Sequence, residues 1–417
     1  MRPPRVLLHV VLFLPCFLYW ISPQCSSQTP PPPPSLIPAT FEFLDARLAI
    51  VYPVIQAFKA IISSDPHGVT QTWTGPNICN YTGFFCDHPP DNLSAIALAA
   101  VDFNGFMLSA PTLVGFLDAL PDISVFHANS NRFLGILPPN LRNLPYLSEL
   151  DLSNNIFTGV FPDTLLAVPG LTFLDLRYNL FAGPVPPQIF ASDFIDVVFL
   201  NNNLFTLTLP TTLSSTPARY LTFANNKFVG PIPQSIGNLS ESLVEVLFLN
   251  NHLTGCIPYE VGFLKIATVF DVGNNLLTGP LPCSLGCMEK AEVLNFAGNQ
   301  MYGQVPEAVC RLPSLKNLSL SSNYFTHVGY VCLKLIWRGV LDVRRNCIPG
   351  LRGQRSPMEC FLFWLKPKFC LTPWTYNFIP CKRWWLKGYA PPRRGLRSES
   401  IARVTYSALH RHRLAGL

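Results

Sequence analysis

The stretch "LSELDLSNNIFTGVFP", from Leu147 to Pro162, returns 24 residues later as "LTFLDLRYNLFAGPVP", from Leu171 to Pro186. Both copies have the spacing LxxLxLxxNxFxGxxP. The asparagine of this pattern recurs at intervals of 23 to 25 residues along most of the chain. Such a constant period indicates one structural unit that is repeated. The asparagines are Asn131, Asn155, Asn179, Asn203, Asn226, Asn251, Asn275, Asn299 and Asn323.

A period of about 24 residues with leucines at these offsets is typical of a leucine-rich repeat, in which each unit forms a short strand and a return segment. A degenerate first copy runs from Leu93 to Phe106, with Val101 in the asparagine position. We therefore predict an α/β solenoid, a leucine-rich repeat horseshoe of about ten coils over residues 93–330.

Each letter of the repeat has a physical reason. Leu147, Leu150 and Leu152 are expected to point inward, because stacked neighbours bury a core that no single repeat can bury alone. Asn155 lies where the chain turns, so its buried amide can bond backbone groups of its own and the neighbouring coil. Gly159 supplies the permissive backbone angles of the bend that follows.

The N-terminus has the composition of a secretory signal. Arg2 and Arg5 precede an apolar run from Val6 to Ile21, followed by small residues. We assign residues 1–27 to a signal peptide, with a membrane anchor as the alternative, and residues 28–40 to a proline-rich linker. The apolar run is short for a membrane span, and no later stretch qualifies as one. The sequence thus predicts a secreted protein of the extracellular space.

Secretion favours oxidised cysteines, and most of the cysteines after Cys25 lie near the two ends of the repeats. Cys79 and Cys86 are close enough in sequence to pair. Cys287 and Cys332 are alternative partners for Cys310, and the spacing does not decide between them. An odd number leaves one cysteine for Cys25 or for a second copy of the chain, joined through a C-terminal cysteine. The predicted disulfide cysteines are Cys79, Cys86, Cys287, Cys310, Cys332, Cys347, Cys360 and Cys370.

These cysteines divide the ends of the chain into an N-terminal cap, residues 41–92, and a cysteine-rich C-terminal cap or hinge, residues 331–381. Zinc is disfavoured, since no paired CxxC or histidine spacing is present, and no other cofactor is indicated. Four N-x-[ST] motifs predict glycan sites, at Asn80, Asn92, Asn238 and Asn317.

Two flanking segments carry a resemblance that is more specific than the repeats. "RLAIVYPVIQAFKAIISSDPHGVTQTWTGPNICNYTGFFC", from Arg47 to Cys86, resembles the N-terminal cap of plant leucine-rich repeat extensins and of relatives that lack the extensin part. "RRNCIPGLRGQRSPMEC", from Arg344 to Cys360, resembles the hinge of the same group. The resemblance implies a plant-type horseshoe in the cell wall or apoplast. It also implies binding of basic, cysteine-rich peptides of the rapid alkalinization factor type, with roles in wall integrity and growth.

The C-terminus departs from that family. Only "TPPPPPS", from Thr29 to Ser35, is similar to an extensin motif, so wall cross-linking is not implied. Residues 28–333 contain 21 acidic and 11 basic residues, whereas residues 334–417 contain 3 acidic and 17 basic residues. We expect a disordered basic tail over residues 382–417 and note that it would suit pectin, an abundant wall polyanion. A secreted protein is not expected to meet nucleic acid.

The side chains between the repeat leucines are expected to line the concave face. Acidic and aromatic residues mingle there, which is typical of a binding surface and favours a basic secreted peptide as ligand. No nucleophile, acid–base or phosphate-binding motif is present, so we predict that the protein is not an enzyme. The alternative function is inhibition of microbial pectin-degrading enzymes of the polygalacturonase type. The predicted ligand-binding residues are Glu149, Asp151, Phe173, Asp175, Arg177, Phe199, Tyr220, Glu245 and Asp271.

Overall fold

The structure, a computed structural model, describes residues 41–367, 370 and 376–382. The predicted signal peptide, the proline-rich linker and residues 383–417 of the basic tail lie outside this part of the chain, as do Cys16 and Cys25.

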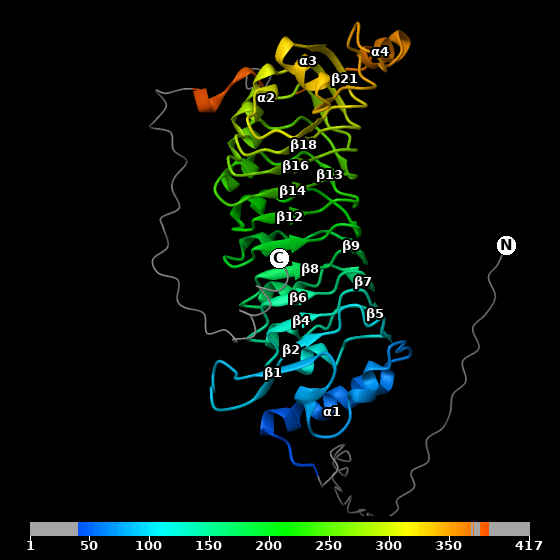
Figure 1. The fold of residues 1–417 in the computed structure, drawn as a ribbon, viewed down its shortest axis with the longest axis vertical. Helices are drawn as coiled ribbons and strands as arrows, with labels where there is room; N and C mark the ends of the chain where they lie inside the picture. Colours follow the sequence, from blue (N-terminus) through cyan, green and yellow to red (C-terminus); the bar gives the residue numbers. More distant parts are fainter. Residues whose placement is uncertain (1–40, 368–369, 371–375, 383–417) are drawn as a thin grey trace, which may run out of the picture. The chain divides into compact units, whose positions relative to one another are not determined.

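One long sheet follows the whole stack of coils, and we call it the primary sheet (Figure 1). Eleven of its strands are parallel neighbours, and β1 pairs antiparallel with β2 at the N-terminal end. Each coil contributes one short strand, as the repeat predicts. The strands are β1 (Phe84–Asp87), β2 (Ala97–Asp102), β4 (Val125–His127), β6 (Glu149–Asp151), β8 (Phe173–Asp175), β10 (Val197–Phe199), β12 (Tyr220–Thr222), β14 (Glu245–Leu247), β16 (Val269–Asp271), β18 (Val293–Asn295), β20 (Asn317–Ser319) and β22 (Leu341–Asp342).

The predicted register of the first coil is wrong. Val101 pairs with Phe126, so it occupies the position of the second leucine, and Phe106 takes the asparagine position. Leu93, predicted to be the first inward leucine, is 73% exposed. The register of this coil is determined by the parallel pairing of β2 with β4, and apolar residues of β2 and Phe103 fill the inward positions instead.

The stack also continues one coil beyond the predicted repeats. Strand β22 pairs in parallel with β20, and Asn346 makes the same bonds as the other repeat asparagines. Its amide donates to the carbonyl oxygens of Leu320 and Val343, at 2.9 and 3.0 Å. This coil lies in the segment that the sequence analysis assigned to the C-terminal cap. It escaped that analysis because a cysteine-rich sequence follows the asparagine.

The asparagine ladder is confirmed. The amide nitrogen of Asn155 donates to the carbonyl oxygens of Ala128 in the preceding coil, at 2.8 Å, and of Leu152 in its own coil, at 3.1 Å. Its oxygen accepts from the backbone N–H of Phe133 at 3.0 Å. Each ladder amide is buried and joins two coils. Leu147, Leu150 and Leu152 are fully buried, as predicted.

A second row of short strands lies along one edge of the primary sheet, and we call these the flank strands (Figure 1). A glycine lies at or next to the end of many of them, because the backbone needs a positive φ there and because the preceding coil approaches closely. Gly159 has φ 98°, and a Cβ atom there would lie 3.1 Å from Cγ2 of Ile136 in the preceding coil. The flank strands are β3 (Ser109–Ala110), β5 (Arg132–Gly135), β7 (Ile156–Val160), β9 (Leu180–Gly183), β11 (Leu204–Phe205), β13 (Val229–Gly230), β15 (His252–Leu253), β17 (Thr278–Gly279), β19 (Gln300–Val305) and β21 (Tyr324–Val328).

Helical segments close the ends and the back of the coils. Helix α1 (Ala46–Ile61) begins at Asp45, whose carboxylate accepts the N–H of Arg47. Its apolar side packs on the first coil, where the Phe58 and Phe116 rings stack 3.9 Å apart. The C-terminal end carries α2 (Glu307–Cys310), α3 (Tyr330–Trp337) and α4 (Pro357–Trp364).

Short 3₁₀ helices form most of the return segments and the N-terminal cap loops. They are η1 (Val69–Thr72), η2 (Ile78–Asn80), η3 (Leu117–Ala119), η4 (Leu141–Asn143), η5 (Asp163–Ala167), η6 (Pro187–Ala191), η7 (Thr211–Ser215), η8 (Gln234–Leu239), η9 (Tyr259–Phe263), η10 (Cys283–Cys287) and η12 (Pro380–Lys382).

All eight predicted disulfide cysteines are bonded, but not all in the anticipated way. Cys310 pairs with Cys332, so the alternative bridge between Cys287 and Cys310 is wrong. Residues 287 and 310 are also neighbours along the stack, but long-range folding of the C-terminal segment brings Cys381 to Cys287. The C-terminal cysteines from Cys347 onward all pair within the chain, which does not support a homodimer joined through one of them. The bridges are Cys79–Cys86, Cys256–Cys370, Cys287–Cys381, Cys310–Cys332 and Cys347–Cys360.

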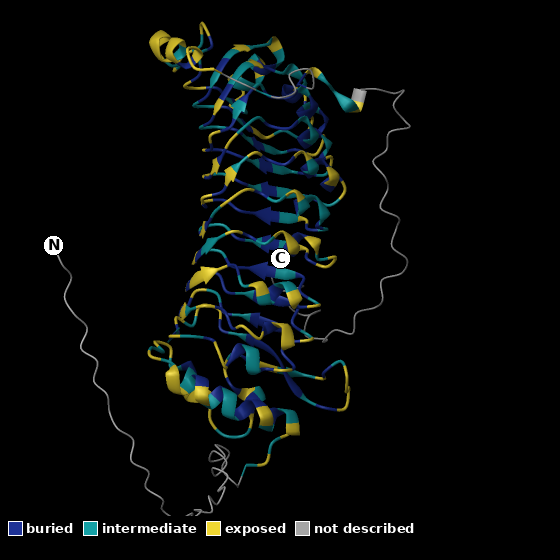
Figure 2. Cartoon of the chain, turned by 180° about the vertical axis from the view of Figure 1, so that it is seen from behind, coloured by how far each residue is buried: buried dark blue, intermediate teal, exposed yellow. Residues whose placement is uncertain are grey.

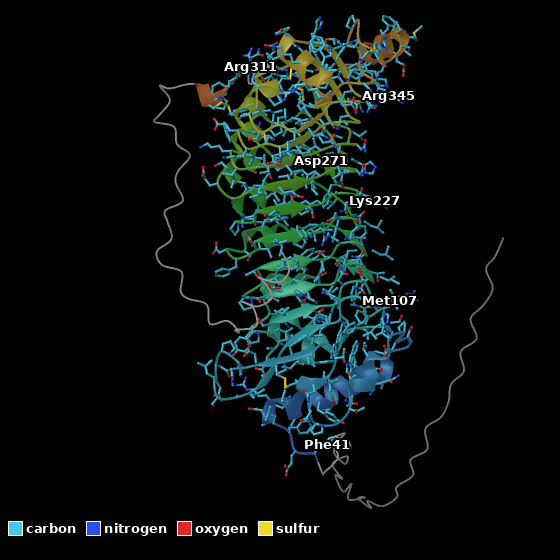
Figure 3. All side chains as sticks on the ribbon, in the orientation of Figure 1. Phe41, Met107, Lys227, Asp271, Arg311 and Arg345 are labelled. Carbon is cyan, nitrogen blue, oxygen red and sulfur yellow. A yellow bond between two sulfur atoms is a disulfide. The ribbon has the colours of Figure 1, made fainter. Side chains whose placement is uncertain are left out.

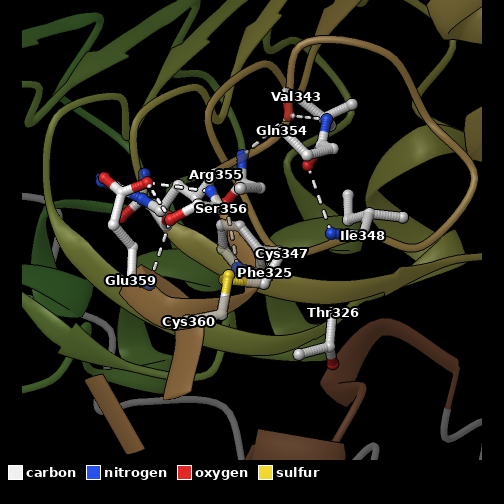
Figure 4. Close-up of a disulfide and its surroundings, with 12 residues drawn as sticks. Phe325, Thr326, Val343, Cys347, Ile348, Gln354, Arg355, Ser356, Glu359 and Cys360 are labelled. Carbon is white, nitrogen blue, oxygen red and sulfur yellow. Dashed lines mark hydrogen bonds and ion pairs between the residues drawn. A yellow bond between two sulfur atoms is a disulfide. The ribbon is translucent and has the colours of Figure 1, made fainter. Parts of the chain in front are cut away.

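The Cys347–Cys360 bridge ties α4 to the last coil (Figure 4). The hydroxyl of Ser356 accepts the N–H of Glu359, and the Glu359 carboxylate accepts the N–H of Ser356, so α4 begins with a capping box. After α4, the bridges of Cys370 and Cys381 hold the chain against earlier coils.

The burial pattern follows the coil geometry. Figure 2 shows buried primary-sheet strands along the stack, with exposed residues on α1, on α4 and along the edges of the coils. No helix within the described residues is both long and apolar enough to cross a membrane.

Candidate ligand-binding face

The outward side chains of the primary sheet form one continuous surface, which we call the open face. In-register parallel pairing places residues from equivalent repeat positions side by side, so Glu149, Phe173, Val197 and Tyr220 form one row. A second row next to it contains His127, Asp151, Asp175 and Phe199. Register therefore brings together residues that are about one repeat apart in sequence.

Aromatic rings occupy the middle of this surface. The Phe173 ring lies edge-on to that of Phe199, with centroids 6.0 Å apart. The guanidinium of Arg177 lies 4.6 Å from the centre of the Phe199 ring, and that of Arg219 lies 5.6 Å from the Tyr220 ring. These contacts hold the rings in fixed orientations, which lowers the entropy cost of binding a partner to them.

Asp175 is not the open carboxylate that the sequence predicted. Its side chain is 0% exposed and lies beneath Arg177, whose Nε is 2.9 Å from both carboxylate oxygens and whose Nη2 is 2.6 Å from Oδ2. Burial raises the pKa of Asp175 to about 6, Arg177 opposes the rise, and Asp151 adds to it. Burial likewise works against the charge of Arg177, but Asp175 outweighs it and raises the Arg177 pKa. The pair positions Arg177 over Phe199 and contributes no net charge to a ligand.

The charge of Glu149 also has a partner. Its Oε2 lies 3.2 Å from Nε2 of His127, a residue that the predicted site does not include. Burial disfavours the charged imidazole, but Glu149, Asp151 and Asp102 outweigh burial and raise the His127 pKa. The His127 ring also lies 6.3 Å from that of Phe173, which joins the charged and aromatic parts of the face.

Three other carboxylates on the face have no cationic partner among the described residues. Asp151 accepts only the N–H and hydroxyl of Ser153, at 2.9 and 2.7 Å. Asp271, labelled in Figure 3, accepts the N–H of Gly273 at 2.9 Å, and burial raises its pKa. Burial also raises the pKa of Glu245, for which no ion pair is present in the described chain. These three groups supply the negative potential of the face.

Sequence reasoning missed the aliphatic part of the open face. Four half-buried residues lie among or beyond the aromatic rings, where the sequence analysis emphasised acidic and aromatic residues. Their repeat positions point outward, but valine and leucine are common in strands and carry neither a charge nor a ring that would mark them as ligand contacts. They are Val197, Leu247, Val269 and Val293.

The predicted glycan positions are all in the described part of the chain. Asn80, which ends η2, is exposed, as are Asn92, Asn238 and Asn317. Asn317 lies on β20 and faces outward, as expected from its repeat position, and its Oδ1 accepts the hydroxyl of Ser319 at 3.0 Å.

Comparison with known proteins agrees with this architecture. The chain is 45% identical to leucine-rich repeat extensin-like protein 6 of Arabidopsis thaliana over 356 residues, which is 85% of this chain and 75% of that protein. The chain belongs to the leucine-rich repeat extensin-like family. A second relative, leucine-rich repeat extensin-like protein 4 of the same plant, is 44% identical over 27% of this chain and 21% of its own length. The family model "Leucine Rich Repeat" matches residues 146–167.

Solved structures with this fold include plant receptor ectodomains. The LRR ectodomain of GASSHO1/SCHENGEN3 from Arabidopsis thaliana, in complex with CASPARIAN STRIP INTEGRITY FACTOR 2, aligns with a TM-score of 0.65. It is 24% identical over 71% of this chain and 35% of that chain, which shows the fold alone. The Arabidopsis receptor kinase HAESA ectodomain, in complex with an IDA peptide hormone, aligns with a TM-score of 0.59 at 26% identity over 67% of this chain and 46% of its own. These relatives are extensin-like proteins and receptor ectodomains.

Proposed function

We propose that this plant leucine-rich repeat extensin-like protein acts outside the cell, where its open face binds a basic, cysteine-rich signalling peptide of the rapid alkalinization factor type. In this role it acts in cell-wall integrity and growth. One observation carries the proposal. Fixed aromatic rings lie between carboxylates that have no cationic partner among the described residues, with Asp151 on one side and Glu245 and Asp271 on the other.

The spacing of these groups suits an elongated ligand. Asp151 on β6 and Glu245 on β14 are four strands apart, about 19 Å at ~4.8 Å per strand. A peptide segment with cationic side chains toward its ends and an apolar centre would meet carboxylates and rings in that order. The acidic groups attract such a ligand from a distance, whereas the rings and valines retain it by contact.

The structure of the HAESA receptor ectodomain supports a peptide ligand, since that ectodomain holds a peptide hormone.

Binding kinetics test the proposal. The full chain is immobilised and a synthetic, oxidised peptide of this type is passed over it at two salt concentrations. We expect Glu245→Gln with Asp271→Asn to slow association and weaken its salt dependence, because the carboxylates act at long range. Phe199→Ala should speed dissociation by at least about tenfold if the ring is an anchor.

Two control variants have matching chemistry elsewhere. Glu289→Gln removes an exposed carboxylate away from the open face, and Phe194→Ala removes an exposed ring from a return segment. Both should bind as the unchanged protein does. Equal kinetics in Phe199→Ala and Phe194→Ala would refute the proposed face. Binding to a microbial polygalacturonase but not to the peptide would favour the inhibitor function instead.

A further inference from the structure

The flank strands expose a row of aliphatic side chains that the proposed function does not use. These residues, which we call the flank ladder, come from five consecutive coils and are each between 38 and 66% exposed. Together they present on the order of 600 Å² of apolar surface, the upper end of what a soluble monomer normally exposes in one patch. The flank ladder consists of Leu134, Ile136, Ile156, Val160, Leu180, Leu204, Leu207 and Val229.

Strand pairing makes these side chains one surface. Leu134 is the register partner of Ile156, Leu180 is that of Thr158, and Leu204 is that of Ala182. Ile136 covers Gly159, and Val160 lies against Gly183 in the next coil. Leu180 is thus a diagonal neighbour of Ile156 and Val160, and Leu204 is a diagonal neighbour of Leu180, two residues away along the paired strand. The ladder runs obliquely along the stack, on the edge where β5, β7 and β9 lie in Figure 1.

The charged residues in and directly beside the flank strands of the ladder are basic. Arg132 precedes the first ladder residue, and Lys227, labelled in Figure 3 on the same edge, lies beside the last. Both are exposed, and neither forms an ion pair with any residue in the part of the chain that the structure describes. Strands β5, β7, β9, β11 and β13 contain no acidic residue. The ladder thus lies between two uncompensated cations, four coils or about 19 Å apart at ~4.8 Å per coil.

We propose that the flank ladder is a docking surface for an amphipathic helix of a partner protein, about 13 residues long at ~1.5 Å per residue, with acidic residues at both ends. Charge complementarity selects those acidic ends. The hydrogen bonding of the flank strands favours a helix as the partner. Backbone N–H groups of these strands already donate to carbonyl oxygens of the preceding coil, as Thr206 does to Gly183 and Val229 does to Leu207. An extended peptide on this apolar face would leave its own backbone groups without partners, whereas a helix satisfies them internally.

The charges disfavour a second copy of this chain as the occupant. Any twofold arrangement of two flank ladders places Arg132 opposite Arg132 or opposite Lys227, so cations meet in either case. The ladder also differs from the open face in the ligand that it selects. The open face has uncompensated carboxylates and favours a basic ligand, whereas the flank ladder favours an acidic one.

A designed peptide tests this directly. The probe is a fluorescent 15-residue helical peptide with leucines on one face and two glutamates at each end, and its control has lysines in place of the glutamates. Fluorescence anisotropy with the full chain should show saturable binding of the glutamate peptide, at least about tenfold tighter than of the lysine peptide.

Variants then locate the site. Leu180→Glu should weaken binding by at least about tenfold, because it puts an unpaired charge under the helix. Thr254→Glu adds the same charge at an exposed position outside the ladder and should leave affinity unchanged. Arg132→Glu with Lys227→Glu should reverse the preference toward the lysine peptide.

Three results would overturn the inference. These are no saturable binding of the glutamate peptide, equal affinities in Leu180→Glu and Thr254→Glu, and a dimer in light scattering that Val160→Glu dissociates. The last would make a second copy the occupant. Thermal unfolding of each variant checks that the fold is retained, which is expected because every substituted side chain is exposed.

Discussion

Replacement of one ladder asparagine by alanine should destabilise the solenoid far more than its small change in volume suggests. In Asn203, the amide nitrogen donates to the carbonyl oxygens of Leu176 and Leu200, at 2.8 and 3.1 Å. Its oxygen accepts the N–H of Phe181 at 3.1 Å. All three partners are in buried residues, so water does not replace the lost bonds.

The size of the loss in stability depends on which hydrogen bonds each partner of Asn203 keeps after the substitution. The Leu176 carbonyl keeps a bond from Asn179, and the Leu200 carbonyl keeps one from Asn226, so each loses one of two. The Phe181 N–H has no other acceptor among the hydrogen bonds of the described chain, and an orphaned buried donor costs about 1–3 kcal/mol. With about 1 kcal/mol for each of the two lost amide bonds, Asn203→Ala should lower the free energy of unfolding by about 3–5 kcal/mol.

Denaturant unfolding at constant pH measures this, and hydrogen exchange locates the effect. Protection should fall first at Phe181 and in its two neighbouring coils, because each coil contacts mainly its neighbours. Asn140→Ala, at an exposed position outside the ladder, is the control and should change stability by less than about 0.5 kcal/mol. The reasoning would fail if both variants lost less than about 1 kcal/mol, since buried bonds would then count no more than exposed ones.

Three further perturbations give distinct readouts. Gly230→Ala should destabilise the fold by about 1–3 kcal/mol in thermal unfolding, because φ is 76° and the new Cβ would lie 2.7 Å from Cγ2 of Thr208. Gly75→Ala is its control: φ is 79° there and no atom lies near the new Cβ, so this variant measures the cost of the backbone conformation alone. His127→Gln should remove a stability contribution that is full below pH 6.5 and lost as pH rises through the raised folded pKa, and pH-dependent melting that is unchanged would contradict this. Cys79→Ser with Cys86→Ser should cost about 2–5 kcal/mol, and an unchanged melting temperature would show that the N-terminal cap does not need its bridge.

The amino-acid pattern is sufficient to define the repeat unit and its core. Leucine spacing requires strands with inward side chains, and a buried asparagine at each turn must find backbone partners. The pattern therefore predicts correctly where Leu150 and Asn155 lie. Those constraints are local and recur in every coil. The outward direction of open-face side chains followed from the same period.

Contacts between coils and between distant segments of the chain become visible only in the folded protein. The sequence indicated that Asp175 faces outward, but not that Arg177 would cover it and neutralise its charge. The sequence left Cys310 with two possible partners at similar spacing, Cys287 and Cys332. In the structure, the C-terminal segment packs against earlier coils and brings Cys381 to Cys287, and Cys310 is bonded to Cys332. The first coil lacks an asparagine, so pairing with β4 determined its register. Side-chain charge, burial and long-range pairing are properties of neighbours, and a one-dimensional pattern does not specify which neighbours the folded chain supplies.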